Sequence, residues 1–537
     1  MKLIISFLSL LSVVSLYAYD LEVNGIYYDA DVNKMELTVV NGEKPYSGTI
    51  NIPDSVNYKG RIFSVIRIAK STFTNTSIVE ISIPKSITEI PKQEFKNCEN
   101  LCKVEFHEGL KYIDEEAFYN CVSLQEIIIP SSVNYICKAA FCHSGIKRLI
   151  IQDGITEIRM YSGAFNNLDL EFMYLGRSYK GIDVYYVGVF NDSHINNIKI
   201  GPNVEYLPYY GLQYCQIKYI EIPSNVKELG ENCFNGSKLE ELIITDSTSP
   251  LYVNTYYSGG DNSIIISKKL YMGRNIKNTE NISSVYPRLT FRGYSEYLGE
   301  SVDDYELVIG KKVTDLRDID FGNGLSVITN YNPIPQILGG KTFSDQAYLF
   351  LQLGVPYGCI GKYKTADVWK NFFNIVEMSK VEAENLELKI ENSNICVGDT
   401  TLIKGTIHPA NSSDTIQWKS SDTKIATVSN EGVVTAIAPG KAHITAVCGK
   451  ITAACEVTVL EPNIDIEFSD NKLTVITEGY RDESSIKIFS VLGKCIYKKS
   501  VKNGDKIDLL KLNSGTYIVQ VISGNINISK RIVKSNK

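Results

Sequence analysis

A bulky apolar residue returns every 22 to 25 residues through the middle of the chain, and this period constrains the fold more than any other feature. Eight consecutive positions carry it: Phe73, Phe95, Phe118, Phe141, Phe165, Phe190, Leu212 and Phe234. A fixed period of this length is typical of repeat architectures, in which each unit packs on its neighbours. The sequence therefore predicts a solenoid, with these eight residues as a core ladder.

The unit that begins at Leu124 indicates what one coil looks like. Leu124, Ile127 and Ile129 point to one side of an extended segment. Pro130 ends that segment, and an irregular turn around Phe141 closes the coil. A coil of this length buries its apolar row by stacking on its neighbours at about 4.8 Å. We therefore expect a mainly β fold, with a parallel sheet along one face of the solenoid.

Cysteines stand three residues after the ladder residue in three units, at Cys98, Cys121 and Cys215. Other units place Thr76, Ser144 and Leu168 at the same point. The position is interpreted as a small buried slot in which a reduced Cys acts as a small apolar group. A disulfide between Cys98 and Cys121 of neighbouring coils, or a metal site, are the alternatives, although no His accompanies these cysteines.

Three units read IPKSITEIPKQEFKNC, IPSSVNYICKAAFCHS and IPSNVKELGENCFNGS. They resemble the BspA-like leucine-rich repeats, whose units follow IP-x-S-V-x-x-I and A-F-x-x-C. The resemblance extends over residues 48–376 and implies a leucine-rich-repeat solenoid. Residues 48–304 are interpreted as the repeats, which become irregular from residue 245.

Both ends of such a solenoid need a cap that covers the last coil. Residues 19–47 are predicted to form a β-hairpin that caps the first coil. Residues 305–380 are predicted to hold a last repeat and a C-terminal cap. The helix-like segment ADVWKNF would cover the core there with Trp369, Phe372 and Phe373.

Two smaller modules follow the solenoid. Residues 381–460 contain about seven short strands, and the pieces VGDT, IQWKSSD and IATVSNEGVVTAIAPGKAHITAV resemble the group 2 bacterial Ig-like domain. The resemblance implies an Ig-like β-sandwich with Trp418 in its core, used as a spacer or adhesive stalk.

Residues 461–537 are predicted to form a small C-terminal β-sandwich. Their segments IKIFSVLGKCIYK, LNSGTYIVQV and SKRIVK resemble the C-terminal sorting domain of type IX secretion cargo. The resemblance implies contact with the secretion machinery, passage across a bacterial outer membrane, and commonly removal of the domain. A second stalk sandwich is the alternative.

The N-terminus resembles a secretory signal peptide at residues 1–18. Met1 and Lys2 precede an apolar run from Leu3 to Leu16, and a small residue, Ala18, stands at the expected cleavage point. A buried N-terminal strand or helix is the alternative. We expect a secreted or cell-surface protein, exposed outside the outer membrane of a bacterium.

Composition and motifs argue against several classes of function. The net charge of −6 disfavours a nucleic-acid-binding body. Zinc-protease, nucleophile-elbow, phosphate-loop and dinucleotide-binding signatures are missing, so we expect neither an enzyme nor a cofactor. The run from Asp29 to Asn33 faintly resembles a calcium loop, but Lys34 and Val40 replace the required Gly and Glu. It is interpreted as a hairpin turn, without a metal.

A recognition surface is the favoured site. Strand alternation predicts Ile128, Ile150 and Met173 on the outward face of the main sheet. The second extended piece of the coils would present Tyr112, Tyr135 and Tyr206. Tyrosines also crowd the irregular coils: Tyr174, Tyr179, Tyr185, Tyr186, Tyr209, Tyr210, Tyr214 and Tyr219. Apolar and Tyr-rich patches with a charged rim suit contact with proteins or glycans.

The resemblance implies adhesion, by non-covalent binding to host extracellular-matrix or cell-surface proteins or to other bacterial cells. A surface protein that captures glycans or scavenges nutrients is the alternative function. A structural alternative also stays open, in which the tyrosines cover the edges of coils and bind nothing.

Overall fold

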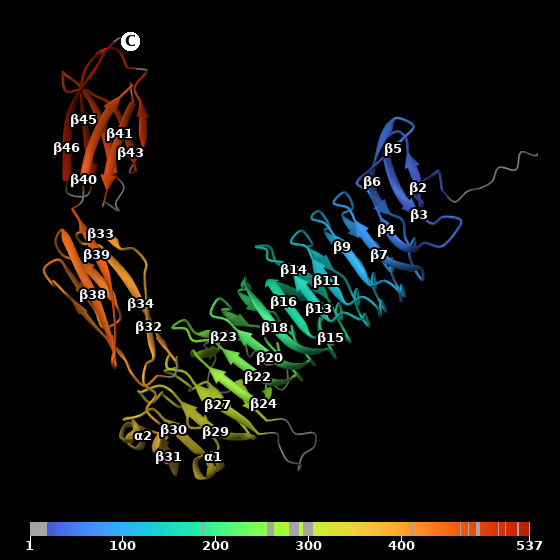
Figure 1. Ribbon diagram of the computed structural model, residues 1–537, viewed down its shortest axis with the longest axis horizontal. Helices are drawn as coiled ribbons and strands as arrows, with labels where there is room; N and C mark the ends of the chain where they lie inside the picture. The colour runs from blue at the N-terminus through green and yellow to red at the C-terminus, as the bar shows by residue number, and fades with distance from the viewer. Residues whose placement is uncertain are drawn as a thin grey trace, which may run out of the picture. The chain divides into compact units, whose positions relative to one another are not determined.

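The computed structural model describes residues 19–184, 187–254, 263–278, 289–293, 304–409, 412–461, 463–470, 472–478, 484–502, 504–510, 512–523 and 526–535. The predicted signal peptide and the candidate residues Tyr185 and Tyr186 lie outside these ranges. The chain divides into two units, Met1–Met378 and Ser379–Lys537. Almost all of the regular structure is β, which confirms the predicted fold class (Figure 1).

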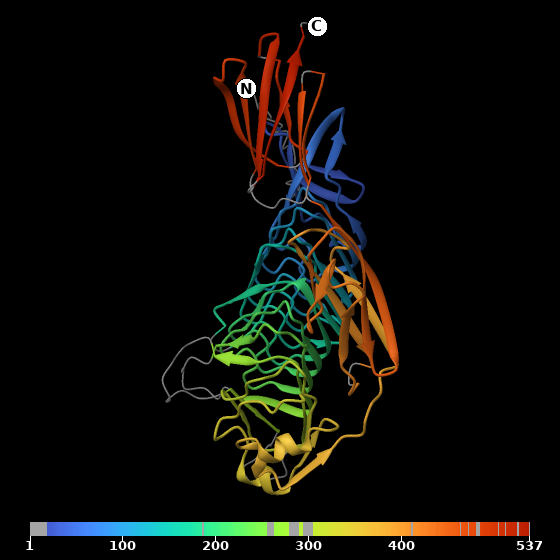
Figure 2. The ribbon, with the colours of Figure 1, turned by 90° about the vertical axis from the view of Figure 1, so that its left-hand side faces the viewer.

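The first unit is a solenoid whose main sheet is parallel (Figures 1 and 2). A three-stranded part comes first, with β4 (Ser47–Asn51), β7 (Ser77–Ile83) and β9 (Lys103–Phe106). The long part contains, in spatial order, β11 (Glu126–Ile129), β13 (Arg148–Ile151), β16 (Phe172–Arg177), β18 (His194–Asn203), β20 (Gln216–Ile222), β22 (Lys238–Ile244), β24 (Ser263–Met272), β27 (Tyr305–Ile309), β29 (Leu325–Asn330), β30 (Gln352–Val355) and β31 (Asn374–Glu377). Three strands pair beside this path: β15 (Asp169–Leu170), β26 (Leu289–Arg292) and β28 (Ile319–Phe321).

Short strands from the second extended piece of each coil form two further parallel sheets. One contains β8 (Glu89–Ile90), β10 (Tyr112–Ile113), β12 (Tyr135–Ile136), β14 (Ile158–Tyr161) and β17 (Tyr179–Ile182). The other contains β19 (Tyr206–Leu207), β21 (Glu228–Leu229), β23 (Leu251–Val253) and β25 (Ile276–Asn278). We refer to these as the lateral sheets.

The eight ladder residues are all buried in the core between the main and lateral sheets. From Phe73 to Phe190 the six rings stack in sequence, with centroids 4.9 to 5.3 Å apart and nearly parallel planes. Tyr46 continues the row toward the N-terminal cap, 4.7 Å from the ring of Phe73. One period of the sequence therefore corresponds to one ring in a continuous column.

The turn around each ladder residue uses left-handed backbone. In the coil of Phe118, Glu116 and Asn120 have φ angles of 55° and 60°. Asn tolerates this conformation better than most side chains. In three successive coils the residue two positions after the ladder Phe is Asn, and the amide of Asn97 donates to Asn75 Oδ1 at 3.0 Å while Asn120 donates to Asn97 at 3.1 Å. These amides link the coils from outside the core.

The slot three residues after the ladder residue holds a hydrogen-bond donor in most coils, although Leu168 fills it after Phe165. Cys98 Sγ donates to the Phe73 carbonyl at 3.0 Å, and Cys121 Sγ donates to the Phe95 carbonyl at 3.1 Å. Ser193 makes the equivalent bond to the carbonyl of Phe165 at 3.0 Å. Every cysteine is free, so the Cys98–Cys121 disulfide is not formed. In these coils the slot joins the coil to the backbone of the coil before it, whereas Thr76 and Ser144 bond to the carbonyl of their own ladder residue.

A fully buried arginine spans coils that are not adjacent. Arg177 lies at the end of β16, and its Nη2 donates to the carbonyls of Pro130 and Val133 at 3.0 and 2.8 Å. Its Nη1 donates to the carbonyl of Ser131 at 2.8 Å. Burial lowers the pKa of this guanidinium. The turn after β11 is therefore held by a residue more than forty positions later in the chain.

Arg274 repeats this arrangement in a later coil. It also follows a Gly at the end of a main-sheet strand, in LYMGRN, and it is fully buried. Its Nη2 donates to the carbonyl of Pro223 at 2.9 Å and its Nη1 to that of Ser224 at 3.3 Å. The turn after β20 is held in this way.

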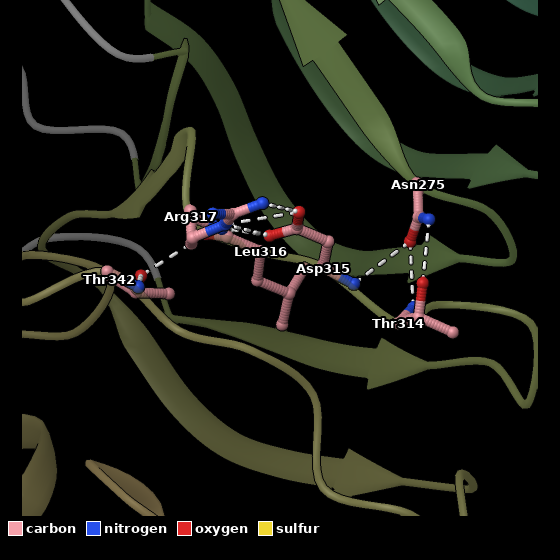
Figure 3. Close-up of polar contacts among 7 residues, drawn as sticks. Asn275, Thr314, Asp315, Leu316, Arg317 and Thr342 are labelled. Atoms are coloured by element: carbon pink, nitrogen blue, oxygen red, sulfur yellow. Dashed lines mark hydrogen bonds and ion pairs between the residues drawn. The ribbon is translucent and has the colours of Figure 1, made fainter.

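Near the C-terminal end of the solenoid, one asparagine connects the coil of β25 to the segment after β27 (Figure 3). Asn275 Oδ1 accepts from the backbone nitrogens of Thr314 and Asp315 at 2.7 and 3.1 Å. Its Nδ2 donates to Thr314 Oγ1 at 2.9 Å. Asp315 also binds Arg317 through both carboxylate oxygens. The irregular coils are therefore joined by side-chain bonds as well as by strand pairing.

The N-terminal cap is larger than the predicted hairpin. Its sheet contains β1 (Leu21–Val23), β2 (Ile26–Asp31), β3 (Glu36–Val40), β6 (Arg61–Ile68) and β5 (Ser55–Tyr58), in that spatial order. β1, β2 and β3 are joined antiparallel, as a hairpin pattern predicts, but β6 returns to pair parallel with β3. The cap sheet therefore continues to Ile68, beyond the predicted end at residue 47.

The C-terminal cap contains α1 (Asp345–Phe350), α2 (Ile360–Thr365) and the 3-10 turn η1 (Trp369–Asn371). Trp369 and Phe372 are buried against Phe343, with ring centroids 5.8 and 5.3 Å from it. Trp369 Nε1 donates to the carbonyl of Gln336 at 2.8 Å. Phe373 was expected beside them, but it is 83% exposed and lies immediately before β31.

The second unit holds two mainly antiparallel modules. In the first, one sheet contains β32 (Asn385–Ile390), β34 (Thr400–His408), β37 (Val433–Ala436) and β36 (Ala426–Val428). Its other sheet contains β33 (Asn394–Cys396), β39 (Ile451–Leu460), β38 (Gly440–Cys448) and β35 (Ile416–Ser420). Trp418 on β35 is half-buried and packs against the apolar clusters of this module.

The last module also has two sheets. One contains β40 (Asn463–Ser469), β41 (Lys472–Glu478) and β44 (Lys506–Asp508), and the other β43 (Cys495–Val501), β42 (Ser484–Ser490), β45 (Gly515–Ser523) and β46 (Ile526–Lys534). Lys534 is buried, and its ammonium donates to the carbonyls of Leu509, Leu510 and Leu512 at 2.7, 3.2 and 2.5 Å. The C-terminal strand is thereby fixed to the loop after β44.

Candidate binding face

The outward face of the main sheet carries a row of apolar and aromatic side chains. Ile128 on β11 lies beside Ile150 on β13, and Ile150 lies beside Tyr174 on β16. Ile128 is 42% exposed, and the other two are half-buried. The row continues through Lys199 on β18. We define the outward face as this row together with the parallel row described below.

The prediction of Met173 on this face is wrong. Met173 is fully buried and pairs with Leu149, in the row that faces the core. The step from Ile150 to its outward neighbour Tyr174 is two residues longer than the step from Ile128 to Ile150. Because side chains alternate along a strand, a register error of one residue exchanges the two faces. Tyr174 takes the outward position instead.

A second outward row lies two residues earlier on each strand. Arg148 Nε donates to Glu126 Oε1 at 2.8 Å, and its guanidinium lies 4.8 Å from the ring centre of Phe172. Asn197 on β18 and Tyr219 on β20 follow in the same row. The outward face thus combines an ion pair with the half-buried aromatic rings of Phe172 and Tyr219. Phe172 and Asn197 were not predicted, although strand alternation from Tyr174 would have indicated them.

Between these rings the outward face is hollowed. A groove of about 300 Å³ is lined by Phe172 on one side, Tyr219 and Glu221 on the other, and Asn197 and Lys199 on the intervening strand. Asn197, Lys199 and Glu221 are exposed. Tyr219 Oη donates to Glu221 Oε2 at 3.3 Å, and burial together with this carboxylate raises the pKa of Tyr219.

The groove exists because three neighbouring strands differ in length and pairing. The ladder between β18 and β20 runs from His194 to Ile198, whereas the ladder between β16 and β18 continues to Asn203. The end of β18 therefore stays with β16, while β20 turns away at Pro223. Arg274 fixes that turn through the Pro223 carbonyl.

The predicted tyrosines of the second extended piece lie on the lateral sheets, so they do not share a face with Ile128. Tyr112 and Tyr135 are neighbours on β10 and β12, with ring centroids 5.5 Å apart. Arg159 on β14 donates to Tyr135 Oη at 2.6 Å and stacks on its ring. Tyr206 belongs to the other lateral sheet, where it pairs with Glu228. Tyr112 and Tyr135 therefore form a pair, and Tyr206 lies apart from them on a different sheet.

Other tyrosines serve the solenoid itself. Tyr179 was predicted among the exposed rings, but it is fully buried, and its Oη donates to the carbonyl of Gly211 at 2.8 Å. Tyr174 Oη donates to Asp153 Oδ1 at 2.7 Å, and burial raises the pKa of Tyr174 to about 12. Tyr174 therefore keeps its ring on the outward face while its hydroxyl is satisfied by protein.

The described residues contain no cluster of three or more His, Cys, Asp or Glu side chains that could hold a metal ion. Asp31 accepts hydrogen bonds from the backbone nitrogens of Asn33 and Lys34, which is the geometry of a tight hairpin turn. Burial raises the pKa of the thiols of Cys98, Cys121 and Cys215, which disfavours the thiolate that a metal needs. Among the residues that the structure describes, no helix is long and apolar enough to cross a membrane.

Comparison with known proteins matches three parts of the chain to known families. Residues 66–187 and 185–286 match the BspA type leucine rich repeat region in six copies. Residues 383–459 match the group 2 bacterial Ig-like domain, and residues 464–535 match the secretion system C-terminal sorting domain. These matches confirm the three resemblances found in the sequence, and the sorting domain assigns the chain to secretion or the cell surface. A search of curated proteins found no match.

Several solved structures are similar to this chain. A leucine-rich repeat protein from Bacteroides capillosus is 26% identical, with 25% of this chain and 97% of that protein covered and a TM-score of 0.22. The pneumococcal vaccine antigen PcpA is 19% identical, with 67% and 98% covered and a TM-score of 0.30. A leucine-rich repeat protein from Bacteroides ovatus is 19% identical, with 67% and 100% covered and a TM-score of 0.28.

Proposed function

We propose that this exported surface protein, built from BspA-type repeats, an Ig-like module and a sorting domain, is an adhesin. It binds host extracellular-matrix or cell-surface proteins, or other bacterial cells, without covalent change and without catalytic turnover. The row of Ile128, Ile150 and Tyr174 on the outward face of the solenoid carries the contact. The Ig-like module serves as a spacer, and the C-terminal domain engages the secretion machinery.

One observation carries this proposal: aliphatic and aromatic side chains lie together on the outward face with charged groups around them. Ile128, Ile150 and Tyr174 form a continuous row over three strands. The ion pair of Glu126 and Arg148 lies beside that row. Interfaces typically combine an apolar centre rich in aromatic residues and Arg with a polar rim. A core role does not account for these side chains, because they point away from the buried ladder.

Binding of the mature chain to matrix proteins, host cells and bacterial cells tests the proposal. A triple variant, Ile128→Ser, Ile150→Ser and Tyr174→Ser, should weaken a saturable interaction at least about tenfold, since hot-spot truncations commonly cost 2 kcal/mol or more. The matched control changes Tyr112→Ser and Tyr135→Ser on the lateral sheet and should bind as the parent does.

Two results would contradict the proposal. If no protein or cell surface binds the mature chain, adhesion is wrong. If the lateral variant loses binding and the triple variant keeps it, the outward face is the wrong surface. Unchanged melting temperatures in both variants are needed for the second conclusion.

A further inference from the structure

We propose that the groove between Phe172 and Tyr219 binds a neutral hexopyranose residue of a glycan. This site is independent of the protein contacts proposed above, because it uses the hollow and the other proposal uses the ridge of Ile128, Ile150 and Tyr174. The inference depends on the width of the groove, the chemistry of its rim and the rigidity of its backbone.

The width suits a sugar ring. Phe172 and Tyr219 lie on β16 and β20, with β18 between them. Two strand spacings separate the side chains by about 10 Å at their origins. A pyranose ring with equatorial hydroxyls presents axial C–H groups on both faces, and two aromatic walls at this separation can each contact one of those faces. The two rings do not fill the gap by packing on each other, since no contact joins them among the described residues.

The rim supplies hydrogen-bonding groups where the hydroxyls of such a ring would lie. Asn197 offers a donor and an acceptor, Lys199 offers donors, and Glu221 offers acceptors. Within the described residues, the side chains of Asn197 and Lys199 bond to no other protein group, so both are available to a ligand. Glu221 accepts one bond, from Tyr219, and has further acceptor capacity.

This rim favours a sugar over an apolar side chain of a protein ligand. A Leu or Phe placed in the groove would remove water from Asn197, Lys199 and Glu221 and return no hydrogen bond to them. Sites with such groups discriminate strongly against ligands that leave them unpaired. One cation and one anion on the rim balance in charge, so a neutral sugar fits better than a sialic or uronic acid.

The groove is also fixed before any ligand arrives. On one side, Arg274 holds the Pro223 turn, and Asn225 Nδ2 donates to the carbonyl of Gly201 at 3.0 Å. On the other side, Arg148 lies over the ring of Phe172 at 4.8 Å. The backbone of this site is therefore preorganised, and the conformational entropy lost on binding is confined to the rim side chains, such as Asn197 and Lys199.

Saturation-transfer NMR and calorimetry on the mature chain, with methyl hexopyranosides and neutral hexose oligosaccharides as probes, test the inference. At least one probe should bind saturably. Tyr219→Ala should abolish the signal, and Asn197→Ala should weaken binding at least about tenfold. Tyr252→Ala is the matched control, because Tyr252 is an exposed Tyr on a lateral sheet and should have no effect.

The outcomes separate this inference from adhesion. If no neutral hexose binds, or if Asn197→Ala and Tyr252→Ala bind alike, the sugar site is wrong. If a protein ligand protects the groove and sugars do not compete, the groove is a protein subsite and the inference is also wrong. If sugars bind as described while no protein or cell is captured, the inference stands and the adhesin proposal fails. Melting temperatures within the parent's error show that each variant is folded.

Discussion

Truncating one ring in the aromatic column measures how much the ladder contributes to the solenoid. Phe118 is fully buried, between Phe95 and Phe141, with ring centroids 4.9 and 5.0 Å away. Replacing a buried Phe by Ala generally costs about 3–5 kcal/mol, because apolar burial is lost and a cavity is left. Stacked aromatic pairs add about 0.5–1.5 kcal/mol each beyond burial. Phe118→Ala should therefore destabilise this region by an amount near the upper end of that range.

A second position in the same ladder isolates the stacking part. Phe234 is also buried and occupies the same place in its coil, but the ladder residue before it is Leu212. Among the described residues no ring stacks on Phe234. Phe234→Ala loses burial without losing two ring contacts, so it should cost about 1–3 kcal/mol less than Phe118→Ala.

Hydrogen exchange read by mass spectrometry is the suitable assay, because the stability of a solenoid is a sum over coils and their interfaces. The amides of the coil around Phe118 and of its two neighbours should lose protection in Phe118→Ala, and distant coils should lose less. Equal loss in Phe118→Ala and Phe234→Ala would refute the contribution of stacking. Unchanged exchange in Phe118→Ala would refute the ladder itself.

Three further predictions concern other parts of the chain. Burial raises the pKa of the Glu94 carboxyl to about 8, although its Oε1 accepts from the backbone nitrogen of Phe73 at 3.0 Å. The folded chain therefore keeps a proton on Glu94 that the unfolded chain releases. This proton stabilises the folded chain fully below about pH 4.5, and the stabilisation is lost as the pH rises to about 8, by at most about 1.4 kcal/mol per pH unit. Glu94→Gln should accordingly reduce the loss of urea midpoint between about pH 5 and about pH 9. Arg177→Met leaves three buried carbonyls unbonded and should cost about 3 kcal/mol in urea unfolding, because the lost bonds outweigh the relief of a desolvated cation. Deletion of residues 461–537 should keep the chain in the periplasm, as cell fractionation would show.

Each of these has a result that would count against it. Identical pH dependence in Glu94→Gln and the parent would mean that this carboxyl is ionised in the folded chain. A neutral Arg177→Met would mean that water satisfies the carbonyls of Pro130, Ser131 and Val133. Normal surface display without the last domain would remove its sorting role.

The sequence predicted which residues lie in the core better than it predicted which residues lie on the outward face. The ladder positions follow from burial, since a 23-residue coil offers few places for a ring as large as Phe118. Outward positions depend on the register of each strand. The step from Ile150 to its outward neighbour Tyr174 is 24 residues, and a step taken as 23 residues places Met173 on the wrong face. Outward positions show no repeating apolar pattern that would reveal such a register error.

The features that escaped prediction depend on contacts between distant residues. The similarity of MYLGRS and LYMGRN is visible in the sequence, but the partners of Arg177 lie 44 to 47 residues earlier and carry no charge that would identify them. The parallel return of β6 to β3 also has no turn signal, unlike the hairpin before it. The groove beside Asn197 results from unequal pairing of three strands, which no local pattern encodes.

The cysteines in three of the slots after the ladder residues also affect how the chain withstands oxidation. A thiol must ionise before it attacks a disulfide or meets an oxidant, and burial keeps the Cys98, Cys121 and Cys215 thiols protonated. Although the protein has twelve cysteines, it can therefore pass through an oxidising compartment without forming incorrect disulfides that would have to be rearranged. Reactive sulfur is left mainly at Cys102 and Cys495, which are exposed.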